Sequence, residues 1–124
     1  MRRRRGRVAG SIAVLAGCAL VSALAVAHAV LQRSEPRADS SLKRPPAEVR
    51  LYFSEQLEPV YSTLRVLDAR DGQVDERDAR VDRANPTLLR ATLPSLPAGR
   101  YRVRWRVISI DADTTEGEFT FRIE

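Results

Sequence analysis

The chain contains a single histidine, His28, and its position suggests metal chemistry. It directly follows Ala25-Val26-Ala27, which fits the Ala-x-Ala pattern of a signal-peptide cleavage site. Cleavage after Ala27 would make His28 the first residue of the exported protein, where it offers both a free α-amine and an imidazole. An internal residue cannot supply both nitrogens. Such donors suit a borderline metal, and copper is the metal we expect.

Residues 1–27 have the composition of an export signal. Five arginines precede residue 8, and residues 8–27 are apolar or small throughout. The sequence therefore predicts a signal helix over 1–27 and one domain over 28–124, exported to the periplasm or the cell surface. Two alternatives stay open. A lipoprotein signal could end before Cys18, since Leu15-Ala16-Gly17-Cys18 resembles a lipobox, or the apolar run could be retained as a membrane anchor.

Without residues 1–27 the domain is formally neutral. Five of the 21 basic residues and none of the 16 acidic residues lie in that segment, which leaves 16 of each sign in 28–124. A nucleic-acid groove needs an excess of positive charge, so no nucleic-acid partner is expected. Cys18 and Met1 are the only cysteine and methionine. The domain therefore has no disulfide, no thiolate site and no methionine site for Cu(I).

The residue inventory argues against an enzyme. One histidine and no cysteine in 28–124 leave no Ser-His-Asp or Cys-His set. A glycine-rich phosphate-binding loop is also missing from the sequence. We therefore expect binding rather than catalysis.

Alternating apolar and polar residues predict short strands. The pattern is clearest over 100–107, where Tyr101, Val103, Trp105 and Val107 alternate with arginines. Trp105 is expected near the core centre, and the arginines on a solvated face balanced by acids such as Glu118. Turn residues separate these runs, which favours an antiparallel β-sandwich or small barrel. The other strands are expected over 48–53, 62–67, 87–93 and 118–123, with short ones at 73–74 and 79–81.

Four motifs, in order, resemble the bacterial copper resistance protein CopC family of periplasmic copper-binding domains. The resemblance implies an all-β, immunoglobulin-like or cupredoxin-like Greek-key β-sandwich that carries copper. The motifs are His28-Ala29-x-Leu31-x-x-Ser34-x-Pro36, Phe53-Ser54-Glu55-x-Leu57, Leu96-x-x-Gly99-x-Tyr101-x-Val103-x-Trp105-Arg106-Val107-x-Ser109-x-Asp111 and Gly117-x-Phe119-x-Phe121.

The resemblance also implies a ligand set for Cu(II). The amine and imidazole of His28 and the carboxylate of Asp111 would bind the ion, with Glu55 nearby. Asp113 stands where the family has its second histidine. Because alternate residues of a strand share a face, Asp111 and Asp113 are expected to converge on one ion. Losing an imidazole predicts weaker, less copper-selective binding.

The ordinary interpretations of these residues stay open. Asp111 and Asp113 could be turn formers between two strands, and Glu55 could be a surface acid at a strand end. The function implied by the resemblance is copper resistance or homeostasis, by a monomer that binds Cu(II) or hands it to a separate CopD-type membrane transporter. The rival is a metal-free immunoglobulin-like interaction or adhesion module that has lost the copper site.

Overall fold

The computed structural model describes residues 28–124, and the expected signal helix and Cys18 lie outside this range. Residues 28–124 form strands and loops with no helix, so no helix in this part of the chain could cross a bilayer. The strands are β1 (Leu31–Glu35), β2 (Ser41–Leu42), β3 (Glu48–Phe53), β4 (Thr63–Leu67), β5 (Arg80–Val81), β6 (Leu88–Thr92), β7 (Gly99–Ile108) and β8 (Thr114–Ile123).

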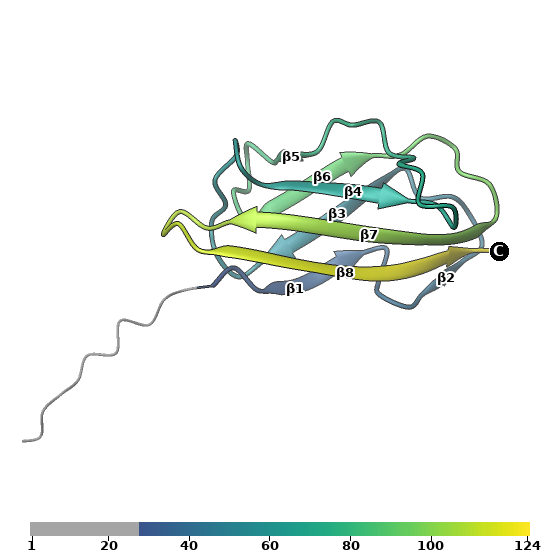
Figure 1. Cartoon of the computed structure of the whole chain (residues 1–124), viewed down its shortest axis with the longest axis horizontal. Helices are drawn as coiled ribbons and strands as arrows, with labels where there is room; N and C mark the ends of the chain where they lie inside the picture. Colours follow the sequence, from purple (N-terminus) through teal and green to yellow (C-terminus); the bar gives the residue numbers. More distant parts are fainter. Residues whose placement is uncertain (1–27) are drawn as a thin grey trace, which may run out of the picture.

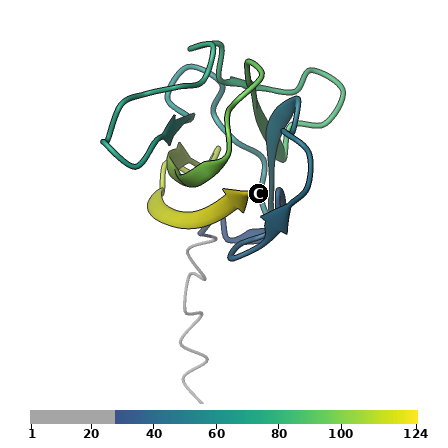
Figure 2. The ribbon, with the colours of Figure 1, turned by 90° about the vertical axis from the view of Figure 1, so that its right-hand side faces the viewer.

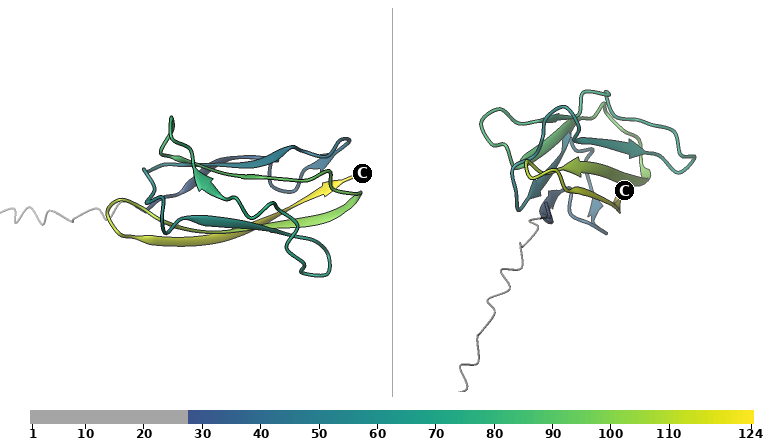
Figure 3. Two further views of the ribbon diagram at one scale, coloured as in Figure 1. Left: turned by 90° about the horizontal axis from the view of Figure 1, so that it is seen from above. Right: turned by 60° about the vertical axis from the view of Figure 1, so that its left-hand side comes forward.

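The strands form two four-stranded sheets packed face to face, as Figure 1 and the view from above in Figure 3 show. One sheet has the order β1-β3-β6-β5 and the other β2-β8-β7-β4. The chain crosses between the sheets five times from β1 to β7, which gives non-sequential neighbours in both layers. The expected β-sandwich is confirmed.

The longest unit is the β7–β8 hairpin, in which ten residue pairs run in register from Gly99↔Ile123 to Ile108↔Thr114. Its inward residues include Tyr101, Val103 and Val107, all buried, as the alternation predicts. At the carboxyl end of β8, the short strand β2 pairs in parallel with Arg122 and Ile123. The hairpin therefore spans the full length of the sandwich (Figure 1).

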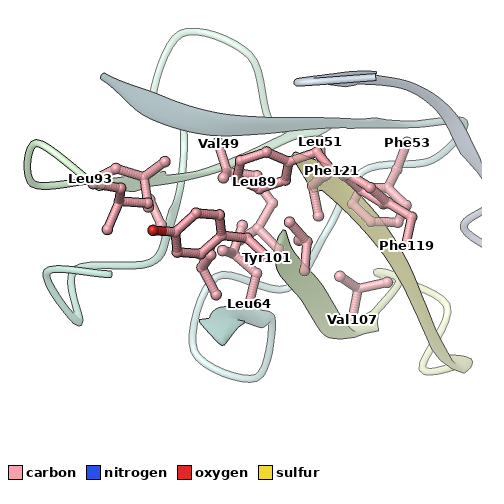
Figure 4. Packing of buried hydrophobic residues seen from close by; sticks show 14 of the residues in the cluster. Val49, Leu51, Phe53, Leu64, Leu89, Leu93, Tyr101, Val107, Phe119 and Phe121 are labelled. Carbon is pink, nitrogen blue, oxygen red and sulfur yellow. The ribbon is translucent and has the colours of Figure 1, made fainter. Parts of the chain in front are cut away.

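Apolar side chains from both sheets meet between the layers, as Figure 4 shows. Burial of this surface is the main force that holds the sheets together. Tyr101 and Phe121 stack with ring centroids 5.5 Å apart. The largest fully buried side chains are those of Phe121, Leu51, Leu57, Leu64, Leu89, Val49, Val66, Val103 and Val107.

Trp105 is not the centre of this core, contrary to the sequence expectation. It is only partly buried and packs against the edge of the cluster, between Phe53 (6.3 Å between centroids) and Phe119 (6.0 Å). The reason lies in its cross-strand partner, Gly117. A Cβ built on Gly117 would lie 2.2 Å from the indole, so the ring occupies the space that a side chain would take. Trp105 therefore covers one end of the core.

The arginine row of β7 faces solvent, as expected. Arg104 and Arg106 pair with Glu118 and Glu116 on β8, each at 3.5 Å. Arg102 pairs with Asp71. Exposed pairs of this kind contribute little to stability, and they indicate a solvated strand face.

The end of the sandwich away from the β7–β8 loop, seen end-on in Figure 2, is closed by the turns 68–79 and 93–99, which we call the far end. Its buried polar side chains, those of Asp75 and Tyr101, are hydrogen-bonded within the protein. Asp75, only 6% exposed, accepts hydrogen bonds from the backbone N–H groups of Val66 (2.8 Å) and Arg77 (3.0 Å). The Tyr101 hydroxyl donates to the Pro97 carbonyl at 2.6 Å.

Candidate metal centre

Four segments meet at the opposite end of the sandwich. The turn 82–87 is one of them, and its Pro86 carbonyl accepts a hydrogen bond from Leu57 N–H at 3.0 Å. The other three, residues 28–30, 54–62 and 109–115, carry the candidate ligands, and we call them together the tip. Figures 1 and 3 show the first described residues and the β7–β8 loop side by side there. Backbone hydrogen bonds connect the last two segments, from Ile110 N–H to the Gln56 carbonyl (3.1 Å) and from Glu58 N–H to the Ile108 carbonyl (2.8 Å). All four candidate ligands lie at the tip.

His28 is exposed, but the residues after it are fixed. Ala29 is 1% exposed, and its carbonyl accepts a hydrogen bond from the Thr115 hydroxyl at 3.0 Å. Val30 exchanges hydrogen bonds with Ser54: its N–H donates to Ser54 Oγ (2.9 Å), and its carbonyl accepts from the Ser54 N–H (2.8 Å). The Ser54 hydroxyl also donates to the His28 carbonyl at 3.3 Å. The backbone of His28 is thus held against β3 and β8.

Asp111 and Asp113 lie in the turn between β7 and β8, not on a strand. The Ser109 carbonyl accepts from Ala112 N–H (2.8 Å), and Ser109 N–H donates to the Asp113 carbonyl (3.0 Å). Ala112 has a φ of 68°, in the left-handed region. The argument that alternate strand residues bring both carboxylates to one face is therefore wrong. Asp111 is exposed, whereas Asp113 is partly buried.

One carboxylate oxygen of Asp113 is buried without a hydrogen-bond partner in residues 28–124, which is unusual for a charged group. Its Oδ2 is buried and has no hydrogen-bond donor among the described residues. A buried carboxylate oxygen normally has a partner, because removal from water without one costs about 1–3 kcal/mol or more. A bound cation would satisfy this oxygen, so Asp113 fits a role as an oxygen ligand.

The carboxylates at the tip differ from those elsewhere in residues 28–124. In this range the side chains of Glu55, Glu58, Asp111 and Asp113 accept no hydrogen bond and form no ion pair. Ten of the other twelve acidic side chains do one or the other; Glu35 and Glu76 are the exceptions. The acids at the tip are free to bind a cation.

The donors share one end of the molecule without forming a finished site. Within residues 28–124 no group of three or more histidine, aspartate or glutamate side chains is close enough to hold a metal ion. Cu(II) binding here would therefore require one residue that binds the ion through two of its own atoms, together with a carboxylate from another residue. An amino-terminal histidine would supply that chelate through its amine and imidazole.

Three residues that support the candidate ligands were not assigned a role from the sequence. Ser54 and Thr115 fix the backbone on either side of Ala29, and Ser109, 1% exposed, closes the turn that carries Asp113. Ser54 and Ser109 stand inside the sequence motifs, so their placement was visible. Their contacts depend on cross-strand register, which the motifs do not give.

The shifted pKa values belong to groups outside the tip. Hydrogen bonding from Thr92 holds the pKa of Asp78 below its ordinary value of 3.8. Burial raises the pKa of Tyr101, and the Asp68 carboxylate adds to this effect. The outer face of the β2-β8-β7-β4 sheet also has a shallow depression of about 510 Å³, lined mainly by Thr63, Arg65, Arg104, Arg106, Glu116 and Glu118. No candidate ligand lines it.

Known proteins match this chain over most of the β-sandwich domain. The CopC domain family model matches residues 31–124. Copper resistance protein C of Pseudomonas syringae pv. tomato is 33% identical over 119 residues, covering 91% of this chain and 94% of that protein. The copper transport protein CutJ of Bacillus subtilis is 30% identical over 98 residues, or 78% of this chain, and the match spans only 18% of CutJ.

Solved structures agree with this match. The crystal structure of CopC from Methylosinus trichosporium OB3b aligns with a TM-score of 0.73 and 31% identity, covering 78% of this chain and 94% of that one. The curated relatives named above are copper resistance and copper transport proteins by name. Together with the two-sheet fold, these matches show that the chain belongs to the CopC family.

Proposed function

We propose that this chain is an exported protein that binds Cu(II) in copper homeostasis or resistance, at the periplasm or the cell surface. The observation that carries the proposal is the tip, where the only histidine of the chain lies on the same end as Asp113, whose buried Oδ2 has no donor. Family membership supports the choice of copper. The metal-free interaction module is not favoured, because it leaves that oxygen unexplained.

The proposed ligands are His28, through its amine and imidazole, and Asp113. Nitrogen and oxygen donors suit the tetragonal preference of Cu(II). Asp111 is exposed and Glu55 half-buried, so we assign both to the outer surroundings of the ion, where their charge attracts it. With one histidine the site is expected to bind Cu(II) more weakly and less selectively than one with two.

The oxidation state follows from the donors. Soft sulfur ligands favour Cu(I), and residues 28–124 contain neither cysteine nor methionine. The amine must lose its proton to bind, and its ordinary pKa is about 7.7–8.0. Cu(II) affinity should therefore rise as the pH increases through this range.

The chelate requires processing between Ala27 and His28, and this cleavage is part of the proposal. Lipidation at Cys18 or retention of residues 1–27 as an anchor would leave His28 with its imidazole alone. We further propose that the metal-free protein is a monomer and passes copper to a separate CopD-type membrane transporter.

Native mass spectrometry of the exported protein, with and without Cu(II), tests the proposal. A mass that begins at His28 and gains one copper is expected, and His28→Ala should lose the copper. A matched control is the same chain with its α-amine acetylated, which keeps the imidazole and should bind at least tenfold more weakly. Correctly processed protein that takes up no Cu(II) would establish the metal-free module instead.

A further inference from the structure

The tip also collects the exposed apolar side chains of the domain. Among residues 28–124 only four large hydrophobic side chains are strongly exposed: Val30 (56%), Val60 (83%), Tyr61 (64%) and Ile110 (53%). One lies on each of the short segments 28–30 and 109–115, and two lie on 54–62. Scattered exposed apolar residues need no explanation, but here all of them occupy one end.

These side chains are carried by one connected frame. Val30 is hydrogen-bonded to Ser54, and Ile110 to Gln56. The loop that carries Val60 and Tyr61 is closed by a hydrogen bond from Tyr61 N–H to the Glu58 carbonyl (3.3 Å). The exposed residues therefore belong to one hydrogen-bonded group of segments rather than to three independent loops.

The charge of the tip is one-sided. Its three segments contain Glu55, Glu58, Asp111 and Asp113 and no lysine or arginine, and the adjacent turn 82–87 adds one charge of each sign, Asp82 and Arg83. The rest of residues 28–124 carries 16 basic and 12 acidic residues. Since none of the four acids has an ion-pair partner within residues 28–124, the tip is an acidic surface with apolar side chains among its carboxylates.

We infer that the tip is a docking surface for a copper-acceptor protein that presents apolar side chains ringed by lysine and arginine. This names the partner of the proposed copper site and so rests on the proposed function. Tyr61 and Val60 would enter the apolar part of the interface, since aromatic side chains dominate interface energies. The four acids would pair with the basic ring and speed the encounter.

The same features argue against two other occupants. A second copy of the chain would bring four more acids against the first four, and like charges facing each other across an interface are costly. A membrane surface rich in anionic lipids would repel the acids in the same way. A cationic protein surface is the complement that both the charge and the apolar side chains favour.

A pair of synthetic peptides tests the inference without copper. Both contain leucines in the same amphipathic pattern; one carries lysines and the other glutamates at the polar positions. Binding of each labelled peptide to the exported protein is measured by fluorescence anisotropy. We expect the lysine peptide to bind about tenfold more tightly at low salt, and this difference to shrink as the salt increases.

Matched variants locate the binding. The combination V60S, Y61S and I110S should weaken the lysine peptide at least fivefold. E55Q with E58Q should weaken it severalfold, whereas the control E35Q with E76Q removes the same charge elsewhere and should not. Circular dichroism checks that each variant is folded. Equal binding of the two peptides, or binding that the tip variants leave unchanged, would overturn the inference.

Two further outcomes bear on the inference. If the wild-type protein sediments as a dimer and the V60S/Y61S variant as a monomer, the tip binds a second copy of the chain instead of an acceptor protein. If the wild-type protein binds vesicles containing phosphatidylglycerol and the same variant does not, the tip binds a membrane surface instead. His28→Ala should keep peptide binding. If copper binding fails while the lysine peptide still docks at the tip, the proposed function is wrong and the docking surface stands.

Discussion

Apart from the exposed Glu76 at the far end, the two ends of the sandwich use their carboxylates in opposite ways. At the far end, Asp75 accepts three hydrogen bonds, from Val66 N–H, Arg77 N–H and Gln73 Nε2. Asp68 accepts from the N–H groups of Arg70 and Gly72, each at 2.9 Å. At the tip, the four acids have no such partner in residues 28–124, and Asp113 Oδ2 has none although it is buried.

This contrast separates acids that hold the fold from acids that are available to a ligand. A carboxylate that accepts hydrogen bonds from backbone N–H groups supplies the acceptors that these groups would otherwise lack in a turn. A buried carboxylate without a donor contributes nothing to the turn and costs desolvation energy. A buried carboxylate without a donor is expected where a ligand from outside the chain can bind it. This favours the tip as the end that binds a ligand.

The largest effect is expected from Asp75→Ala at the far end. The substitution leaves the N–H of Val66, a fully buried residue, without a partner and removes two further hydrogen bonds. We expect the free energy of unfolding to fall by about 3 kcal/mol in urea titrations. Asp111→Ala, at an exposed carboxylate, is the matched substitution and should change it by less than about 0.5 kcal/mol. Equal losses from both would remove the contrast between the ends.

Asp113→Asn sharpens the comparison, because it should separate stability from binding. The free energy of unfolding without metal should stay the same or rise, since a charged oxygen without a partner is lost. Cu(II) affinity of the processed protein should fall about tenfold, or about 1.4 kcal/mol, by isothermal titration with a competing chelator. A clear loss of stability with unchanged affinity would assign Asp113 to the fold instead.

Ser54→Ala tests whether the scaffold of the tip serves the ligand. The variant removes the acceptor for Val30 N–H and the donor to the His28 carbonyl. We expect the free energy of unfolding to fall by about 1 kcal/mol, and Cu(II) affinity to fall severalfold because His28 gains freedom. Ser40→Ala, which removes a hydroxyl bonded to the Arg37 carbonyl, should leave Cu(II) binding unchanged.

The smallest effect is the pH dependence from Asp78, which accepts a hydrogen bond from Thr92 N–H at 2.8 Å. Its pKa is lower in the folded protein than the ordinary 3.8. Its stabilising contribution is therefore complete above the ordinary pKa and is lost as the pH falls through the folded-state pKa. Asp78→Asn should flatten the decline of stability below about pH 4. A decline of equal steepness in the variant would show that other groups cause it.

The sequence predicts most of the fold because alternation survives in the buried strands. β3 and β7 alternate along their length, and both lie where expected. β1 and β2 were not predicted as strands, since Leu31–Glu35 has a buried pattern without alternation and Ser41–Leu42 pairs with the distant β8. The first four residues of β8, Thr114–Gly117, contain no large apolar side chain and become a strand through pairing with β7.

The candidate site was predicted less well than the fold. His28, beside the cleavage motif, and Asp113 lie at the same end of the sandwich, where the site is proposed. The expected strand placement of Asp111 and Asp113 is wrong, because both lie in a turn in which Ala112 takes a left-handed conformation. Such a φ is uncommon for alanine, and no spacing rule predicts it.

The burial of Ala29 has a consequence for the lifetime of a chain that is cleaved after Ala27. Exopeptidases remove residues from an amino terminus by drawing several residues of extended chain into a cleft. Here the chain disappears into the sandwich one residue after His28, with Ala29 fixed to Thr115 and Val30 to Ser54. Trimming would require local unfolding of this segment first. In a chain cleaved after Ala27, as proposed, the fold would thus protect the terminal histidine from exopeptidases.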